Sequence, residues 1–299
     1  MDLSRLRLLR ELAHRGTMTA VGAARGLTSS AVSQQLTALE RHLGIKVLER
    51  VGRRVRLTPE GERLLDHAKN ILQAVELAEA DLRGKSAKPA GVTEVACFPS
   101  FAKARLLPAI LRARSRFPGF EVRIRELETL DAIAALREGR CHIAVVFSYS
   151  LVPVREIADL VSFPLFEEPM LLALPSSWRD ARGKVNLRQL ANEDWIVDSR
   201  QSDDQLLAER ACALAGFAPR ITHAVDDYDL VLRMVGAGLG IGFVPESAFA
   251  ISKVKSVVRR TPGGVALKRS VRGLTRKGLA TSAAVRMLIS ELGDPRMTS

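Results

Sequence analysis

The 299-residue sequence is poor in the features that mark secreted, membrane-spanning and metal-binding proteins. Its three cysteines, Cys97, Cys141 and Cys212, form neither a disulfide framework nor a Cys-x-x-Cys pair, so we expect buried free thiols. No run approaches the roughly 18 uncharged apolar residues of a membrane span. Arginines interrupt the apolar N-terminal segment, which therefore lacks the core of a secretory signal. We expect a cytoplasmic protein with no metal, cofactor or membrane partner.

Motifs of catalysis are equally scarce. The five histidines show no His-Glu-x-x-His spacing, and the sequence has no Gly-rich phosphate loop or Gly-x-Ser-x-Gly elbow. The stretch GAGLGIG, residues 236–242, imitates a dinucleotide-binding fingerprint. It follows a predicted helix and leads into a strand, which is the reverse of that motif's order. We therefore expect a protein that is not an enzyme.

Positive charge is concentrated at the two ends of the chain, whose net charge is +12. Residues 1–88 carry 16 lysines and arginines against 10 acids, and residues 250–299 carry 11 against two, whereas the middle is mildly acidic. Basic ends indicate a polyanionic partner such as nucleic acid. The C-terminal segment taken alone fits a solvated basic surface equally well.

The N-terminal residues have the pattern of a helix-turn-helix. LSRLRLLRELAHR, residues 3–15, places leucines on one helical face, and Gly16 ends that helix. A second short helix begins with Thr19 as its N-cap. The third, TSSAVSQQLTALERHLG, is capped by Thr28 and has a regular apolar stripe. Its other face carries short, uncharged hydrogen-bonding side chains, namely Ser29, Ser30, Ser33, Gln34 and Thr37.

The segment IKVLERVGRRVRLT predicts a basic hairpin, or wing, that turns at Gly52-Arg53 and offers Arg50, Arg53 and Arg54 to phosphates. Thr58 and Pro59 then begin a long helix that runs to about Leu82. The apolar stripe of this helix has a period near 3.5, which favours pairing with a second copy of the chain. Burial against the following domain is the alternative. Residues 84–91, rich in Gly, Pro and Lys, form the predicted hinge.

From residue 92 onward, strands and helices alternate as β-α-β-α-β, which is typical of an α/β domain with a mainly parallel sheet. A second round begins near Leu165, so we predict two lobes with a ligand cleft between them. The predicted boundaries are 1–58 for the DNA-binding domain, 59–83 for the linker helix, 84–91 for the hinge and 92–299 for the two-lobed domain. Lobe 1 comprises about 92–163 and 268–299, and lobe 2 about 164–267.

The chain resembles the LysR-type transcriptional regulators over essentially its whole length. The matching segments are AARGLTSSAVSQQLTALERHLGIKVLER, RVRLTPEG, ACFPSFAKARLLPAIL, FPGFEVRIREL and GAGLGIGFVPES, in that order. The resemblance implies a winged helix-turn-helix, a dimerising helix and an effector domain like a type 2 periplasmic binding protein. It implies homodimers that assemble into homotetramers on double-stranded promoter DNA, whose binding or bending a small organic acid or amino acid modulates. RNA polymerase is left open as a further partner.

Under this resemblance, helix 28–44 reads the DNA major groove. Gln34 suits adenine, a pairing worth ~1–3 kcal/mol of discrimination. Ser100 opens a helix, where a hydroxyl and free N–H groups suit an anion, or where serine is simply an N-cap. The acids Asp203-Asp204 and Asp226-Asp227-Asp229 are either amine ligands or helix N-caps. The effector residues predicted by position are Ser100, Phe101, Thr129, Phe147, Ser148, Gln201, Ser202 and Phe243.

A different class of function remains open at this point. The chain could be a ligand-independent or nucleoid-type DNA-binding protein that carries a vestigial solute-binding domain. Such a protein would not need an intact ligand cleft, so the interior of the C-terminal domain distinguishes the two hypotheses.

Overall fold

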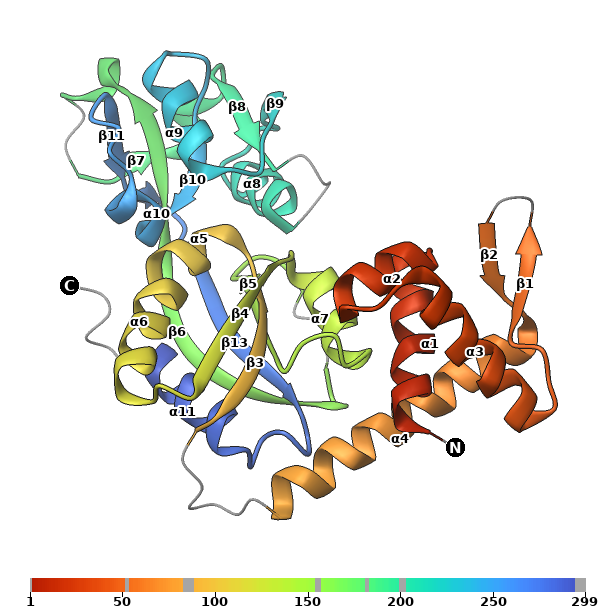
Figure 1. The fold of residues 1–299 in the computed structure, drawn as a ribbon. Helices are drawn as coiled ribbons and strands as arrows, with labels where there is room; N and C mark the ends of the chain where they lie inside the picture. Colours follow the sequence, from red (N-terminus) through yellow and green to blue (C-terminus); the bar gives the residue numbers. More distant parts are fainter. Residues whose placement is uncertain are drawn as a thin grey trace. The chain divides into compact units, whose positions relative to one another are not determined.

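A computed structural model describes residues 2–51, 54–82, 89–153, 157–180, 183–198 and 203–293 (Figure 1). Its contacts divide the chain into two compact units, Met1–Lys85 and Ser86–Ser299. No helix in these described ranges combines the length and apolar character needed to cross a lipid bilayer.

The N-terminal unit begins with three helices, α1 (Leu3–Arg15), α2 (Met18–Arg25) and α3 (Ser29–Leu43). The predicted ends of α1 and α3 are confirmed, because Gly16 is left-handed at φ 72° and the Thr28 hydroxyl caps α3. The predicted N-cap of α2 is wrong. Thr17, not Thr19, has the extended backbone of a cap, and its hydroxyl accepts from the Ala20 N–H at 3.2 Å.

The leucine stripes of α1 and α3 face each other in one apolar core. Its fully buried members include Leu6, Leu9, Val32, Leu36 and Leu39. The helix periodicity therefore predicted correctly which face of each helix is buried. It leaves the polar face of α3 outside the core.

Glu40 joins the end of α3 to the wing. Although it is an acid, it is buried, and one of its carboxylate oxygens accepts from the N–H groups of Val47 at 2.9 Å and Leu48 at 3.1 Å. These bonds fix the start of β1 (Leu48–Val51), which pairs antiparallel with β2 (Arg54–Leu57). The two strands confirm the predicted hairpin, and its tip, Gly52-Arg53, lies outside the described residues.

Helix α4 (Pro59–Leu82) confirms the predicted long helix, and the Thr58 hydroxyl caps it by accepting from the Gly61 N–H at 3.0 Å. The first half of its apolar stripe packs inside its own unit. Leu64, Ala68 and Leu72 are buried in the core of α1 and α3, whereas Ala78 is exposed. Only the second half of the stripe is thus left to pair with another copy of the chain.

The C-terminal unit is built on a sheet with the strand order β10-β6-β13-β5-β3-β4. The strands β3 (Gly91–Cys97), β4 (Phe120–Glu126) and β5 (Ile143–Tyr149) are parallel, as predicted. They alternate with a helical run and with α7 (Thr129–Arg137). The helical run consists of α5 (Pro99–Phe101), a π-helical turn (Ala102–Leu106) and α6 (Leu107–Arg116).

A long strand, β6 (Leu160–Pro175), corrects the expected mainly parallel sheet with a second round starting near Leu165. β6 is continuous and runs from one lobe into the other (Figure 1). It pairs antiparallel with β13 (Lys268–Arg276) and farther along with β10 (Gly242–Pro245) and β11 (Val257–Arg260). Prolines made this stretch resemble a break, but a register shift in β13 lies opposite Pro164, and strands accept proline at such irregularities.

Lobe 2 has its own parallel pair, β8 (Asp194–Val197) and β9 (Arg220–Ala224), packed around the buried Trp195. Its helices are α8 (Asp203–Leu214), α9 (Tyr228–Gly236) and α10 (Glu246–Ile251). The short strands β7 (Val185–Asn186) and β12 (Pro262–Gly263) pair nearby. Two 3-10 turns, Ser176–Trp178 and Leu187–Leu190, complete the lobe, and α11 (Ala283–Leu292) packs on the core of lobe 1.

Replacing Glu40 with alanine is expected to lower the free energy of unfolding of the N-terminal unit by about 2–3 kcal/mol, since the two N–H groups lose their charged acceptor. Chemical denaturation of the full chain measures this change. Glu49→Ala is the matched control, because Glu49 is exposed on the same hairpin, and its effect should stay within about 0.5 kcal/mol. Equal effects of the two variants would contradict the role given to Glu40.

Candidate functional site

The open face of α3 is the first candidate site. All five polar side chains predicted to bind DNA from this helix are exposed, namely Ser29, Ser30, Ser33, Gln34 and Thr37. The neighbouring Gln35 differs, because its side-chain oxygen accepts a hydrogen bond from Arg5 of α1 at 3.1 Å. Gln34 and Gln35 are therefore adjacent in sequence but lie in different surroundings.

The wing carries the predicted phosphate-binding arginines at its tip. Arg50 lies opposite Val55 in the β1–β2 register, and Arg54 lies opposite Val51, so both positions flank the turn. Arg53 lies outside the described residues.

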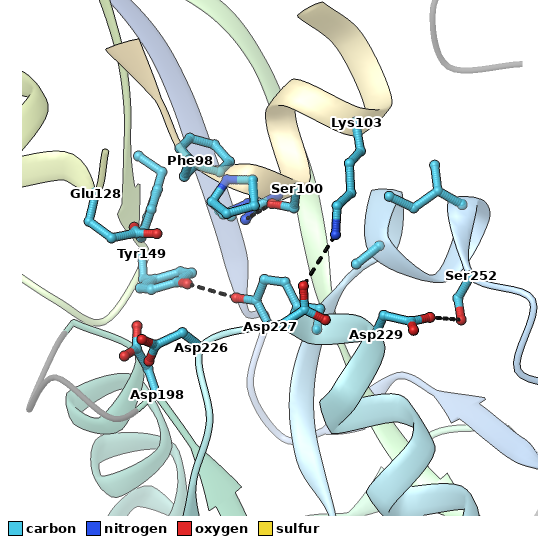
Figure 2. Close-up of a pocket in the computed structure, with 16 residues that line it drawn as sticks. Phe98, Ser100, Lys103, Glu128, Tyr149, Asp198, Asp226, Asp227, Asp229 and Ser252 are labelled. Atoms are coloured by element: carbon cyan, nitrogen blue, oxygen red, sulfur yellow. Dashed lines mark hydrogen bonds and ion pairs between the residues drawn. The ribbon is translucent and has the colours of Figure 1, made fainter. Parts of the chain in front are cut away.

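The second candidate site is a cavity of about 270 Å³ between the lobes of the C-terminal unit (Figure 2). The ends of β3 and β5 and the start of the α5 run border it from lobe 1, and the β9–α9 connection borders it from lobe 2. The polar residues that line it are Ser100, Lys103, Glu128, Tyr149, Asp198, Asp226, Asp227, Tyr228, Asp229, Ser252 and Arg269.

Arg269 is the residue of this cavity that sequence reasoning missed. It is only 1% exposed, and its Nε and Nη2 atoms donate to one oxygen of Glu168 at 3.0 and 2.6 Å. Its Nη1 atom donates to the Ser100 hydroxyl at 3.2 Å. The guanidinium also lies over the rings of Phe98 and Phe147, 4.9 and 5.7 Å from their centroids. A buried cation thus forms one wall of the cavity.

The basic C-terminal segment was expected to contact a polyanion or to be solvated, and two of its arginines do neither. Arg269 pairs with Glu168, and the buried Arg276 donates to the backbone carbonyls of Leu136 and Cys141. Because both residues lie in β13, the alternation of a half-buried strand was the one signal available. Composition alone could not show which cations point inward.

Ser100 reaches the cavity as predicted, but it is not an N-cap. The N-cap is Phe98, so Ser100 is the second residue of the helical run, and it is only 8% exposed. The alternative of a plain N-cap serine is therefore wrong. Phe147 lines the same cavity, which brings these two predicted residues together.

The other predicted effector residues lie elsewhere. Thr129 and Ser148 line a separate small crevice beside Phe147, whose N–H donates to the Thr129 hydroxyl at 3.3 Å. Phe101 and Phe243 are core residues, stacked against Phe166 and tilted against Trp195 respectively. Phe101 follows Ser100 by about 100° of helical rotation, which turns it into the core. Gln201 and Ser202 lie outside the described residues.

Two contacts join the lobes across the cavity. The Lys103 ammonium lies 3.2 Å from a carboxylate oxygen of Asp227, and the hydroxyls of Tyr149 and Tyr228 lie 3.3 Å apart (Figure 2). The two tyrosines are the only ones in the sequence. Asp227 also caps α9 by accepting from the Leu230 N–H at 3.0 Å, which confirms the N-cap interpretation for this acid.

The interior beside this cavity is electrically negative. Burial, and then the nearby carboxylate of Asp198, raise the pKa of Asp204 to about 7. Burial also raises the pKa of Tyr228, and Asp204 raises it further. The described residues contain no group of three acidic, histidine or cysteine side chains arranged to hold a metal ion.

The three cysteines are free and buried, as the sequence predicted. Burial raises the pKa of each thiol to about 12. At neutral pH they are therefore protonated, and a protonated thiol is a poor nucleophile.

Comparison with known proteins agrees with this organisation. The family model described as the LysR substrate binding domain matches residues 86–294. The model described as the bacterial regulatory helix-turn-helix protein, lysR family, matches residues 3–62.

Among the relatives, the transcriptional dual regulator GltC of Bacillus subtilis is 28% identical over 87% of this chain and 85% of its own. A "Probable hydrogen peroxide-inducible genes activator" of Mycobacterium xenopi is 35% identical over 58% of this chain and 89% of its own. The solved structure of full-length OxyR from Pseudomonas aeruginosa shares the fold, with a TM-score of 0.75 at 21% identity over 98% of this chain and 94% of that one. Because one family model covers more than half of the sequence, the chain belongs to the LysR family of DNA-binding transcriptional regulators.

Proposed function

We propose that α3 and the wing bind operator DNA, and that a small molecule with a carboxylate binds Ser100 and Arg269 in the interlobe cavity and changes that DNA binding. The observation that carries the proposal is the pair of buried hydrogen-bond donors that meet in the cavity. The protein acts in this way by binding rather than by catalysis, in the cytoplasm.

The chemistry of α3 supports contact with base edges. Its exposed side chains are short and uncharged, so the helix can approach the floor of the major groove closely. Gln34 can donate to and accept from adenine at once, whereas Ser29 and Ser30 lie at the helix N-terminus, where phosphate is favoured. Arg50, Arg53 and Arg54 of the wing supply charge without base preference.

The chemistry of Arg269 supports a bound carboxylate. A guanidinium has five N–H donors. Four of them donate to protein acceptors, two to Glu168 and one each to Ser100 and Ser247. Within the described residues, the fifth, on Nη1, has no acceptor, and the Ser100 hydroxyl donates to none. A carboxylate with one oxygen on each group would use both donors.

The burial of these two groups makes the interaction strong. Ser100 and Arg269 are both more than nine-tenths buried, and charge-assisted hydrogen bonds in such surroundings contribute about 1.5–3 kcal/mol each. A vestigial domain would not need to keep a buried cation with an open donor facing a cavity. This feature therefore favours a ligand-responsive regulator over a ligand-independent or nucleoid-type protein.

The assembly follows from α4. The exposed second half of its apolar stripe can pair with a second copy of the chain, and homodimers would then associate into homotetramers. We propose the domain boundaries 1–58, 59–83, 84–91 and 92–299 on the same basis. RNA polymerase is a further candidate partner on promoter DNA.

Gln34→Ala is expected to weaken binding to the selected operator by about 10- to 100-fold, since a bidentate base contact is worth ~1–3 kcal/mol. Binding to random duplex should change little. Fluorescence anisotropy on an operator selected from random DNA measures both affinities. Gln35→Ala is the matched control, because Gln35 contacts Arg5, and it should leave the preference intact. Equal losses on both duplexes would show that α3 does not read bases there.

Ser100→Ala is expected to weaken effector binding about tenfold or more, because one buried donor is lost. A thermal-shift screen of straight-chain carboxylic acids and amino acids, followed by calorimetry, measures this loss. Ser115→Ala, an exposed serine at the far end of the same helical run, serves as the control. A ligand whose affinity is the same for the wild type and Ser100→Ala would place the site elsewhere.

Hydrogen peroxide is expected to leave the folded protein unmodified, because all three thiols are buried and their pKa is about 12. Mass spectrometry after peroxide treatment, with operator affinity measured in parallel, tests this. The unfolded protein is the positive control for thiol oxidation. Oxidation of a folded cysteine together with altered DNA binding would instead assign this chain the peroxide response named for its Mycobacterium xenopi relative.

A further inference from the structure

We infer that the ligand carries a protonated amine in addition to its carboxylate, so that it is an amino acid or a related amino-carboxylic acid rather than a plain organic anion. The inference rests on the proposed function, which supplies the carboxylate subsite. It adds the acidic residues that line the same cavity.

The acidic wall is formed by residues from both lobes. Figure 2 shows Glu128 from lobe 1 and Asp198 and Asp226 from lobe 2 gathered beside Tyr149. In all, five carboxylates and only two cations line the cavity among the described residues. An amine placed at this wall would contact both lobes at once.

The two cations of the cavity already have acidic partners. Lys103 is paired with Asp227 at 3.2 Å, and Arg269 is paired with Glu168 at 2.6 Å. A further carboxylate, Asp229, lies 2.8 Å from Arg233. The electrostatic potential at the acidic wall is therefore set by Glu128, Asp198 and Asp226 together with whatever else they contact.

The surroundings report a negative potential at this wall. Asp204 lies behind it, and Asp198 helps to raise the pKa of the Asp204 carboxyl to about 7, although Arg269 acts in the opposite direction. Capping does not explain these acids, because the N-cap of α9 is Asp227 and not Asp226. Each ionised carboxylate offers about four acceptor sites, so it can accept from an ammonium in addition to its other contacts.

The two walls differ in sign, and this difference gives selectivity. A carboxylate at Ser100 and Arg269 is favoured, whereas a second carboxylate at the acidic wall would meet like charge at short range. An ammonium there would be attracted. A tenfold preference corresponds to about 1.4 kcal/mol, which a single partly buried ion pair can supply.

Three five-carbon probes of matched length test the inference by calorimetry and thermal shift on the full chain. They are 5-aminopentanoate, pentanoate and glutarate, which end in an ammonium, a methyl and a carboxylate. We expect 5-aminopentanoate to bind at least tenfold more tightly than either of the others. Asp226→Asn should reduce this preference severalfold without changing the affinity for pentanoate. Asp180→Asn, an exposed acid of lobe 2 that does not line the cavity, is the matched control.

The outcomes separate the inference from the proposed function. Equal or tighter binding of glutarate or pentanoate, with a loss in Ser100→Ala, would overturn the inference and keep the carboxylate subsite. Preferential binding of 5-aminopentanoate that survives Asp226→Asn unchanged would also overturn it. Binding that is insensitive to Ser100→Ala would reject the proposed function itself. Failure of all three probes to bind at millimolar concentration would count against the inference.

Discussion

The buried ion pair of Arg269 and Glu168 is the interaction on which the C-terminal unit depends. It ties β13 to β6, and the second oxygen of Glu168 accepts from the Ser247 N–H at 2.8 Å, which adds the start of α10. Removing one member of such a pair leaves an uncompensated buried charge, at a cost of about 3–5 kcal/mol. The pair is therefore both a structural fastening and the fixed support of the guanidinium that faces the cavity.

The same fastening places the cavity where the lobes meet. β6 connects the lobes as one continuous strand, and Arg269 lies on its partner strand next to the start of the α5 run. The Lys103–Asp227 pair and the Tyr149–Tyr228 contact also span the lobes. A ligand that touches both walls would favour the arrangement of the lobes that it fits best, because a ligand shifts an equilibrium only through its differential affinity.

Membership of a family settles the fold more firmly than the chemistry of its ligand site. This chain shares the fold of OxyR, yet its own thiols are buried and protonated at neutral pH, so their surroundings do not favour redox chemistry. The cavity instead combines a cationic wall with an acidic one. Specificity in such a domain depends on a few side chains, which can change while the sheets and helices that hold them stay the same.

Local patterns in the sequence determined the helices, the wing and the order of strands and helices. Leucine periodicity, Gly16 and Thr28 predicted α1 and α3 because each signal acts within a few residues of itself. Tertiary structure decided the rest. Arg269 meets Glu168 across 101 residues and Ser100 across 169, and β6 is one strand only because β13, from the far end of the chain, pairs along it. Periodicity encodes which face of an element is buried, but it carries no information on which distant element covers that face.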